Sequence, residues 1–110
     1  MKIVPTRHAL GKFLERELAE QVKESVIVPR KIVREFQLSK YSEQEIIRRS
    51  YLYTYHPETH HFFVLQVDRR KGEIRVITVF RPEDIRRENL TEMASGWRKL
   101  SDVYPFCLVP

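Results

Sequence analysis

Hydrophobic residues follow two different periods along this 110-residue chain, and the change falls near Tyr51. Before that residue, apolar positions recur every three or four residues, which is typical of helices with one buried face. After it, aromatic and β-branched residues fill three short runs, which is typical of strands. The pattern therefore predicts a helical first half and a mainly stranded second half.

The first predicted helix covers residues 7–24, and Thr6 is placed to cap its start. Its apolar positions recur at helical spacing, and they are Leu10, Phe13, Leu14, Leu18 and Val22. Basic residues fall on the opposite side, namely His8, Lys12, Arg16 and Lys23. We therefore expect one buried face and one basic stripe on this helix.

Two further helices are predicted before the period changes. Residues 29–38 have helical apolar spacing, with Pro29 suited to a first helical turn. Ser42 and Glu45 have the spacing of a capping box, which predicts a helix over residues 42–50. Tyr41 and Ile46 are placed to form the hydrophobic staple of that helix.

The stranded half predicts an antiparallel meander of three strands, over residues 51–55, 61–67 and 74–80. The connections, residues 56–60 and 69–72, are short enough for hairpins. Further strands are predicted at the two ends of the chain, and a helix precedes the last of them.

Residues 2–5 can form an opening strand and residues 103–109 a final one. Asn89 and Glu92 resemble a second capping box and predict a C-terminal helix. The expected fold is α+β, one domain over residues 1–110 in which helices pack on one face of an antiparallel sheet of three to four strands.

Composition narrows the possible functions. Twenty Lys and Arg residues against fifteen Asp and Glu give a net charge of +5, which favours nucleic acid, anionic lipid or an acidic protein as partner. No apolar run approaches the length of a membrane span, so we expect no membrane insertion. The lone Cys107 fits a reducing compartment and predicts a cytoplasmic protein. Scarce Asn and Gln beside abundant Glu and Arg favour a thermophilic source.

Two segments carry a resemblance to a known family. The opening Thr6-Arg-His-Ala-Leu-Gly-Lys-Phe13, the meander, and Gly72-Glu-Ile-Arg-Val-Ile-Thr-Val-Phe-Arg-Pro82 together resemble the RelE/colicin-D-like ribonuclease toxin superfamily, which also includes barnase and EndoU. The resemblance implies metal-independent RNA cleavage without a cofactor, or a relative that has kept the fold and lost this activity. It also implies a cognate antitoxin as a possible protein partner. By position in the motifs it assigns catalysis to His8, Lys12, Thr78 and Arg81.

Cleavage of this kind needs a base for the ribose 2′-hydroxyl, an acid for the leaving 5′-oxygen and cations for the phosphorane charge. The chemistry of the side chains adds further candidates near one end of the sheet, for proton transfer and base stacking: Tyr53, Tyr55, His56, His60 and His61. Basic residues expected to contact nucleic acid are Arg16, Arg48 and Arg49.

Each of these assignments has a structural alternative. His8 and Lys12 fit a solvated helix face equally well. Thr78 alternates with Ile74, Val76 and Phe80, as an ordinary half-buried strand threonine does. Core packing explains the tyrosines as well as base stacking does. The histidines of residues 56–61 lack metal-site spacing, so we expect no metal.

Residues 31–49 support a different function, a winged helix-turn-helix that binds DNA. The apolar positions that motif needs are present as Val33, Phe36, Leu38 and Ile46, and the following strands would form the wing. Two residues depart from the motif, namely Gln37 at the turn glycine and Glu43 at an apolar position. Glu43 and Glu45 would also direct negative charge at the phosphates from the start of the reading helix. A protein-interaction module without a nucleic-acid role is a third possibility.

Overall fold

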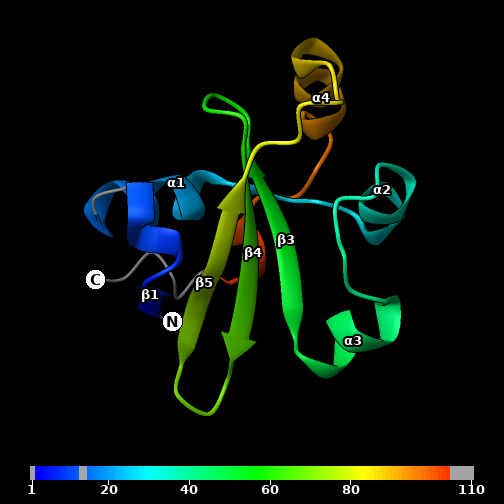
Figure 1. The fold of residues 1–110 in the computed structure, drawn as a ribbon. Coiled ribbons are helices and arrows are strands. Elements are labelled where there is room, and N and C mark those ends of the chain that lie inside the picture. The colour runs from blue at the N-terminus through cyan, green and yellow to red at the C-terminus, as the bar shows by residue number, and fades with distance from the viewer. Residues whose placement is uncertain (1, 13–14, 105–110) are drawn as a thin grey trace.

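The computed structural model describes residues 2–12 and 15–104, without the side chains of Lys12 and Glu15. Its strands are β1 (Lys2–Pro5), β2 (Val26–Ile27), β3 (Tyr51–His56), β4 (His61–Asp68) and β5 (Glu73–Phe80). Its helices are the 3-10 helix η1 (Ala9–Lys12) and the α-helices α1 (Glu15–Glu24), α2 (Arg30–Glu35), α3 (Glu43–Arg48), α4 (Arg87–Ala94) and α5 (Leu100–Val103). The α+β class is therefore confirmed (Figure 1).

The three central strands form the predicted meander. β3 pairs antiparallel with β4, from Tyr51 opposite Gln66 to His56 opposite His61. β4 pairs antiparallel with β5, from Phe62 opposite Phe80 to Asp68 opposite Glu73. The aromatic and β-branched residues that predicted these strands are the ones that fill the sheet.

The complete sheet has five strands in the order β1-β5-β4-β3-β2, and it is mixed, not antiparallel. The predicted opening strand is present as β1, but it runs parallel to β5, with Lys2 opposite Glu73. A parallel pair needs a long crossover between its strands, and the chain between β1 and β5 contains several helices and the rest of the meander. β2 was not predicted, because two residues are too few to show an alternation.

Helices cover both faces of the sheet, which corrects the expected single covered face. Figure 1 shows α1 on one side and α2 and α3 on the other. On the first side, the buried residues of η1, α1 and α5 pack on the sheet, and they are Ala9, Leu18, Val22 and Leu100. On the second side, Val33, Ile46, Leu90 and Ala94 of α2, α3 and α4 form a second core. β4 is therefore buried on both faces over its run Phe62-Phe63-Val64-Leu65.

The helices of the first half differ from their predicted bounds. The expected helix over residues 7–24 is present as η1 and α1, with residues 13–14 between them outside the described residues. Pro29 precedes α2 as its N-cap residue instead of lying in its first turn. The capping box of α3 is confirmed on its Ser42 side, whose hydroxyl accepts the Glu45 backbone N–H at 3.2 Å.

The C-terminal part differs more. α4 begins at Arg87, so Asn89 lies inside the helix and does not cap it. Val103 belongs to α5 and Tyr104 is its C-cap residue, so neither lies in the predicted final strand, and residues 105–109 of that strand lie outside the described residues.

Candidate functional site

A β-bulge decides where Thr78 points. Val64 pairs with Thr78 but the next residue, Leu65, pairs with Val76, so Ile77 is an extra residue in β5. The bulge moves Thr78 to the face of Val64, away from the Ile74 and Val76 face on which simple alternation placed it. Bulges of this kind often redirect a side chain beside a functional site.

Thr6 ties the N-terminal segment to this bulge. Its hydroxyl donates to the carbonyl oxygens of Val76 and Ile77, at 2.8 Å and 3.2 Å, and its backbone N–H also donates to Val76. The same hydroxyl accepts the N–H of Ala9 at 3.4 Å, which is the capping role expected of Thr6, here for η1. His8 is held beside the end of β5 in consequence.

His8, His61 and Arg81 line one groove of about 780 Å³, with Ala9, Gly11, Val79 and Phe80 as its other lining residues. We call it the histidine groove. The two histidines and the arginine come from the segment before η1, the start of β4 and the residue after β5. The structure thus brings together two residues assigned by the family motifs, His8 and Arg81, and one assigned by chemistry alone, His61.

Thr78 lies in an adjoining pocket of about 610 Å³ that shares His8 with the histidine groove. Lys40 also lines this pocket, with its ammonium 5.4 Å from the centroid of the Tyr41 ring. Sequence reasoning missed Lys40, because it lies in a loop far from the motif residues. The side chain of Lys12, the remaining motif residue, lies outside the described part of the chain.

His61 is held in one tautomer and kept neutral. Its Nδ1 lies 2.9 Å from Oε1 of Gln21 in α1, so Nδ1–H donates to this amide oxygen and the lone pair of the neutral ring is on Nε2. Burial, followed by the charge of Arg81 and the neighbouring His56 and His60, lowers the pKa of His61 to about 4. The ring is therefore neutral at pH 7. Gln21, which no motif indicated, sets its orientation.

His56 is buried and joins β3 to α1. Its Nε2 lies 3.1 Å from Oε2 of Glu24, and its Nδ1 accepts the N–H of Thr59 at 3.2 Å. Only 4 % of this residue is exposed, so the structure does not support the predicted contact between His56 and nucleic acid. The pattern of hydrogen bonds points to a structural role in the β3–β4 turn.

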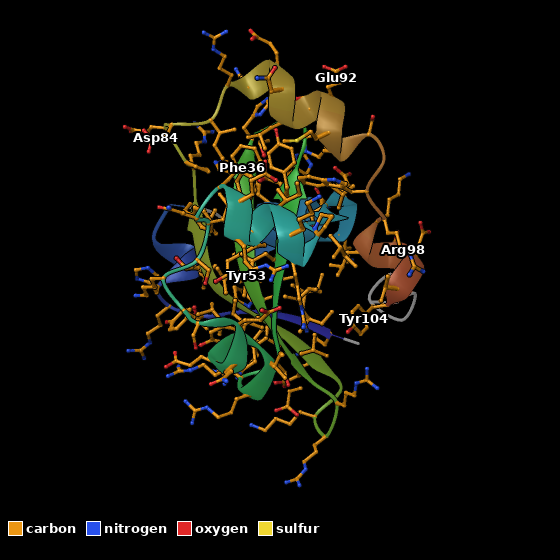
Figure 2. All side chains as sticks on the ribbon, turned by 90° about the vertical axis from the view of Figure 1, so that its right-hand side faces the viewer. Phe36, Tyr53, Asp84, Glu92, Arg98 and Tyr104 are labelled. Carbon is orange, nitrogen blue, oxygen red and sulfur yellow. The ribbon has the colours of Figure 1, made fainter. Side chains whose placement is uncertain are left out.

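Two tyrosines of β3, Tyr53 and Tyr55, belong to the core. Tyr53 is 4 % exposed and its hydroxyl pairs with Ser39, while Tyr55 is fully buried and its hydroxyl pairs with Nδ1 of His60. Burial raises the pKa of both tyrosines. The structure does not support base stacking by these rings, and Figure 2 shows Tyr53 between α2 and α3.

His60 lies in the β3–β4 turn and adopts a left-handed backbone conformation at φ 60°. Burial, then the charges of Arg87 and Arg81, lower its pKa. Its pairing with Tyr55 makes it a residue of the turn and not of the groove.

The arginines predicted to contact nucleic acid are not among the lining residues of the histidine groove. Arg16 is exposed on α1, in an i,i+4 pair with Glu20 at 3.5 Å. Arg48 and Arg49 are exposed on and just after α3. β4 runs from His61, in the histidine groove, to Asp68 at its other end. These two residues are separated by roughly 23 Å at the usual strand rise.

The helix-turn-helix interpretation meets one supporting and one opposing observation. Gln37 adopts φ 51°, the left-handed conformation usually taken by glycine at such a turn. The strands expected to form a wing are instead the centre of the sheet, where Phe62 and Phe63 are fully buried.

Two further properties concern the described residues only. Within residues 2–12 and 15–104, no three His, Cys, Asp or Glu side chains are grouped in a way that could hold a metal ion. In the same part of the chain, none of the helices combines the length and apolar character needed to cross a membrane.

Comparison with models of protein families, with curated proteins and with solved structures finds no match to this chain. The geometry of the histidine groove and the chemistry of its side chains therefore carry the evidence for function.

Proposed function

We propose that this protein binds single-stranded RNA in the histidine groove and cleaves it there by attack of a ribose 2′-hydroxyl on the adjacent phosphate. The observation that carries the proposal is that His8, His61 and Arg81, from distant parts of the chain, line the same groove. Two imidazoles beside a guanidinium supply the proton transfer and the positive charge that such a reaction needs.

In the proposed reaction His8 takes the proton of the 2′-hydroxyl. The 2′-oxygen then bonds to phosphorus, the bond from phosphorus to the 5′-oxygen breaks, and the leaving oxygen takes a proton from water. Arg81 is exposed beside the groove and counters the charge that grows on the phosphate oxygens.

His61 and Thr78 have supporting roles in this proposal. His61 is neutral at pH 7, so its imidazole can form hydrogen bonds with ribose without adding charge, and it is the second candidate for the base. Thr78, in the adjoining pocket with Lys40, is placed to bind the strand beside the site of cleavage.

A toxin-like role in the cytoplasm, with a cognate antitoxin as protein partner, belongs to the same proposal. It depends on the resemblance of the segments around His8 and Thr78 to the ribonuclease toxin superfamily. DNA binding through residues 31–49 is the alternative, and Gln37 is the observation that favours it.

The test is incubation of the purified protein with a labelled single-stranded RNA in the presence of a chelator. We expect cleavage to persist and to leave a 2′,3′-cyclic phosphate or its opened product. A strand with one 2′-deoxyribose at the cut site should resist cleavage there, because the nucleophile is missing. Loss of cleavage with chelator, or cleavage of the deoxy substrate, would contradict the proposed mechanism.

The alternative is tested with the same protein and duplex DNA. Tight and sequence-selective binding to a duplex, lost when Arg48 and Arg49 are both changed to Gln, would favour the helix-turn-helix. Absence of RNA cleavage together with that result would replace the proposed function.

A further inference from the structure

A second groove lies at the opposite end of β4 and is dominated by arginine. Its volume is about 770 Å³, and its lining includes Arg30, Arg48, Arg49, Arg69, Arg70 and Arg75. We call it the arginine groove. These residues come from α2, from α3 and the residue after it, from the β4–β5 turn and from β5, and all six are exposed. Figure 2 shows nitrogen-tipped side chains extending into solvent from α3 and from the β4–β5 turn.

The arginines of this groove form no ion pairs with the described carboxylates. None of the six guanidinium groups lies within 4.0 Å of a carboxylate in this part of the chain. The groove's acidic lining residue, Asp68, uses Oδ1 to accept the backbone N–H groups of Arg70 and Lys71, each at 3.1 Å. Like charges gathered in one concavity repel one another, and an anionic ligand relieves that repulsion.

Arg49 is held in position within the groove. Its guanidinium carbon lies 5.2 Å from the centroid of the Tyr41 ring and 5.9 Å from that of Tyr51. Its carbonyl oxygen accepts Nε2–H of Gln66 at 3.0 Å. An arginine ordered in this way loses less side-chain entropy when it binds an anion.

Aromatic and aliphatic side chains lie among the arginines. Tyr51 and Tyr104 line the groove, and Ile47, also in its lining, is 55 % exposed. A basic groove combined with such side chains matches the usual binding mode for single strands, in which cations contact the backbone and bases stack on rings. α3 has only six residues, and Glu43 and Glu45 lie in its first turn, which disfavours its insertion into a duplex groove.

We infer that the arginine groove binds the phosphate backbone of a single-stranded nucleic acid, at a site separate from the histidine groove. The exposed guanidinium groups come from several elements around the groove, so a polymer can contact more of them than an isolated phosphate can. Because the contacts are to phosphates, RNA and DNA strands bind alike. This inference goes beyond the proposed function and does not require cleavage.

The test uses a fluorescent single-stranded DNA of about 12 nucleotides, within the usual range for such sites, which the proposed reaction cannot cut. Binding is measured by anisotropy at several salt concentrations. The test variant carries Arg48→Gln and Arg70→Gln, which remove one cation from each side of the groove. The control carries Arg98→Gln and Lys99→Gln, two exposed cations outside the groove lining, so that the net charge is the same.

We expect the slope of log affinity against log salt to fall by about 1.4 in the test variant, from two lost contacts at about 0.7 each for a single strand. The control should keep the slope of the unchanged protein. Equal slopes in the two variants would overturn the inference, because the effect would then reflect net charge alone. Tighter binding to a duplex of the same sequence would overturn the single-strand assignment.

Two further measurements separate this inference from others. In the first, inorganic phosphate and chloride compete with the strand at equal ionic strength. Displacement by phosphate but not by chloride would overturn the inference, because the groove would then be a site for an isolated phosphate and not for a nucleic-acid backbone. A protein that binds the strand through Arg48 and Arg70 but cuts no RNA would contradict the proposed function and leave this inference in place. A protein that cuts RNA, and that still binds the DNA strand equally well after Arg48→Gln and Arg70→Gln, would contradict this inference and leave the proposed function in place.

Discussion

The hydroxyl of Thr6 donates a hydrogen bond of 2.8 Å to the carbonyl oxygen of Val76, which is 70 positions later in the sequence. This contact joins the residue after β1 to the bulge of β5, and His8 and Thr78 each lie two positions after one of its two partners. The geometry of the histidine groove thus depends on a hydrogen bond made by neither of its histidines.

We expect Thr6→Val to lower the free energy of unfolding by about 1 kcal/mol, the usual net contribution of a neutral hydrogen bond. RNA cleavage should fall as well, because His8 loses its anchor to β5. Thr6→Ser keeps the hydroxyl and serves as the control. Urea denaturation and cleavage rates of the two variants check the prediction, and equal rates in both would contradict the anchoring role.

The second prediction concerns the centre of the sheet. Val64 is 4 % exposed and pairs with Tyr53 and Thr78 on its two sides. Val64→Asp should unfold the protein at 25 °C, because it places an unpaired charge in the core. Ile47→Asp is the control, since Ile47 is 55 % exposed and its replacement should change stability by less than about 0.5 kcal/mol. Circular dichroism during heating measures the stability of both variants.

Much of the sheet could be predicted from the sequence because its signals are local. The strand runs and the Ser42 cap depend on residues close together in the chain. The two covered faces are also visible in retrospect, because the unbroken apolar run Phe62–Leu65 is typical of a strand buried on both sides. The prediction that Asn89 caps the C-terminal helix is wrong for a physical reason. A cap contributes about 1 kcal/mol, and packing of Leu90 and Ala94 against the core can outweigh it.

The site was predictable only in part. The motif positions indicated His8, Thr78 and Arg81, and the structure places them around one corner of the sheet. The different environments of His56 and His61 were not predictable, because they depend on Glu24 and Gln21 of α1. The sequence separation of Arg30, Arg49 and Arg75 likewise concealed the arginine groove.

The third prediction concerns pH. The pKa of His61 is lowered from 6.5 to about 4, so between these values the unfolded chain binds a proton that the folded chain does not. The contribution of the neutral His61 ring to the stability of the folded protein is therefore present above pH 6.5 and is lost as the pH falls toward 4. We expect His61→Gln to show a smaller drop in melting temperature over this interval than the unchanged protein.

His8→Gln is the control for the pH prediction, because it also replaces one histidine with Gln but at an exposed position, and it leaves the contact of His61 with Gln21 in place. A steeper drop for His61→Gln than for the unchanged protein would contradict the neutral, partly buried state of His61.

The last prediction concerns the proposed base. His8 is exposed and lines both the histidine groove and the pocket of Thr78, so its removal should affect chemistry without affecting the core. We expect His8→Ala to lower the cleavage rate by about 100- to 10,000-fold, the usual contribution of a general base, with the melting temperature nearly unchanged. Arg81→Gln should also slow cleavage, because the phosphate charge loses its counterion, whereas Arg98→Gln removes the same charge outside the groove and should not. Single-turnover rates with a labelled RNA measure these three variants and His61→Gln. An unchanged rate for His8→Ala, with His61→Gln inactive, would transfer the role of base to His61; equal slowing by Arg81→Gln and Arg98→Gln would show that net charge, and not the groove, controls the rate.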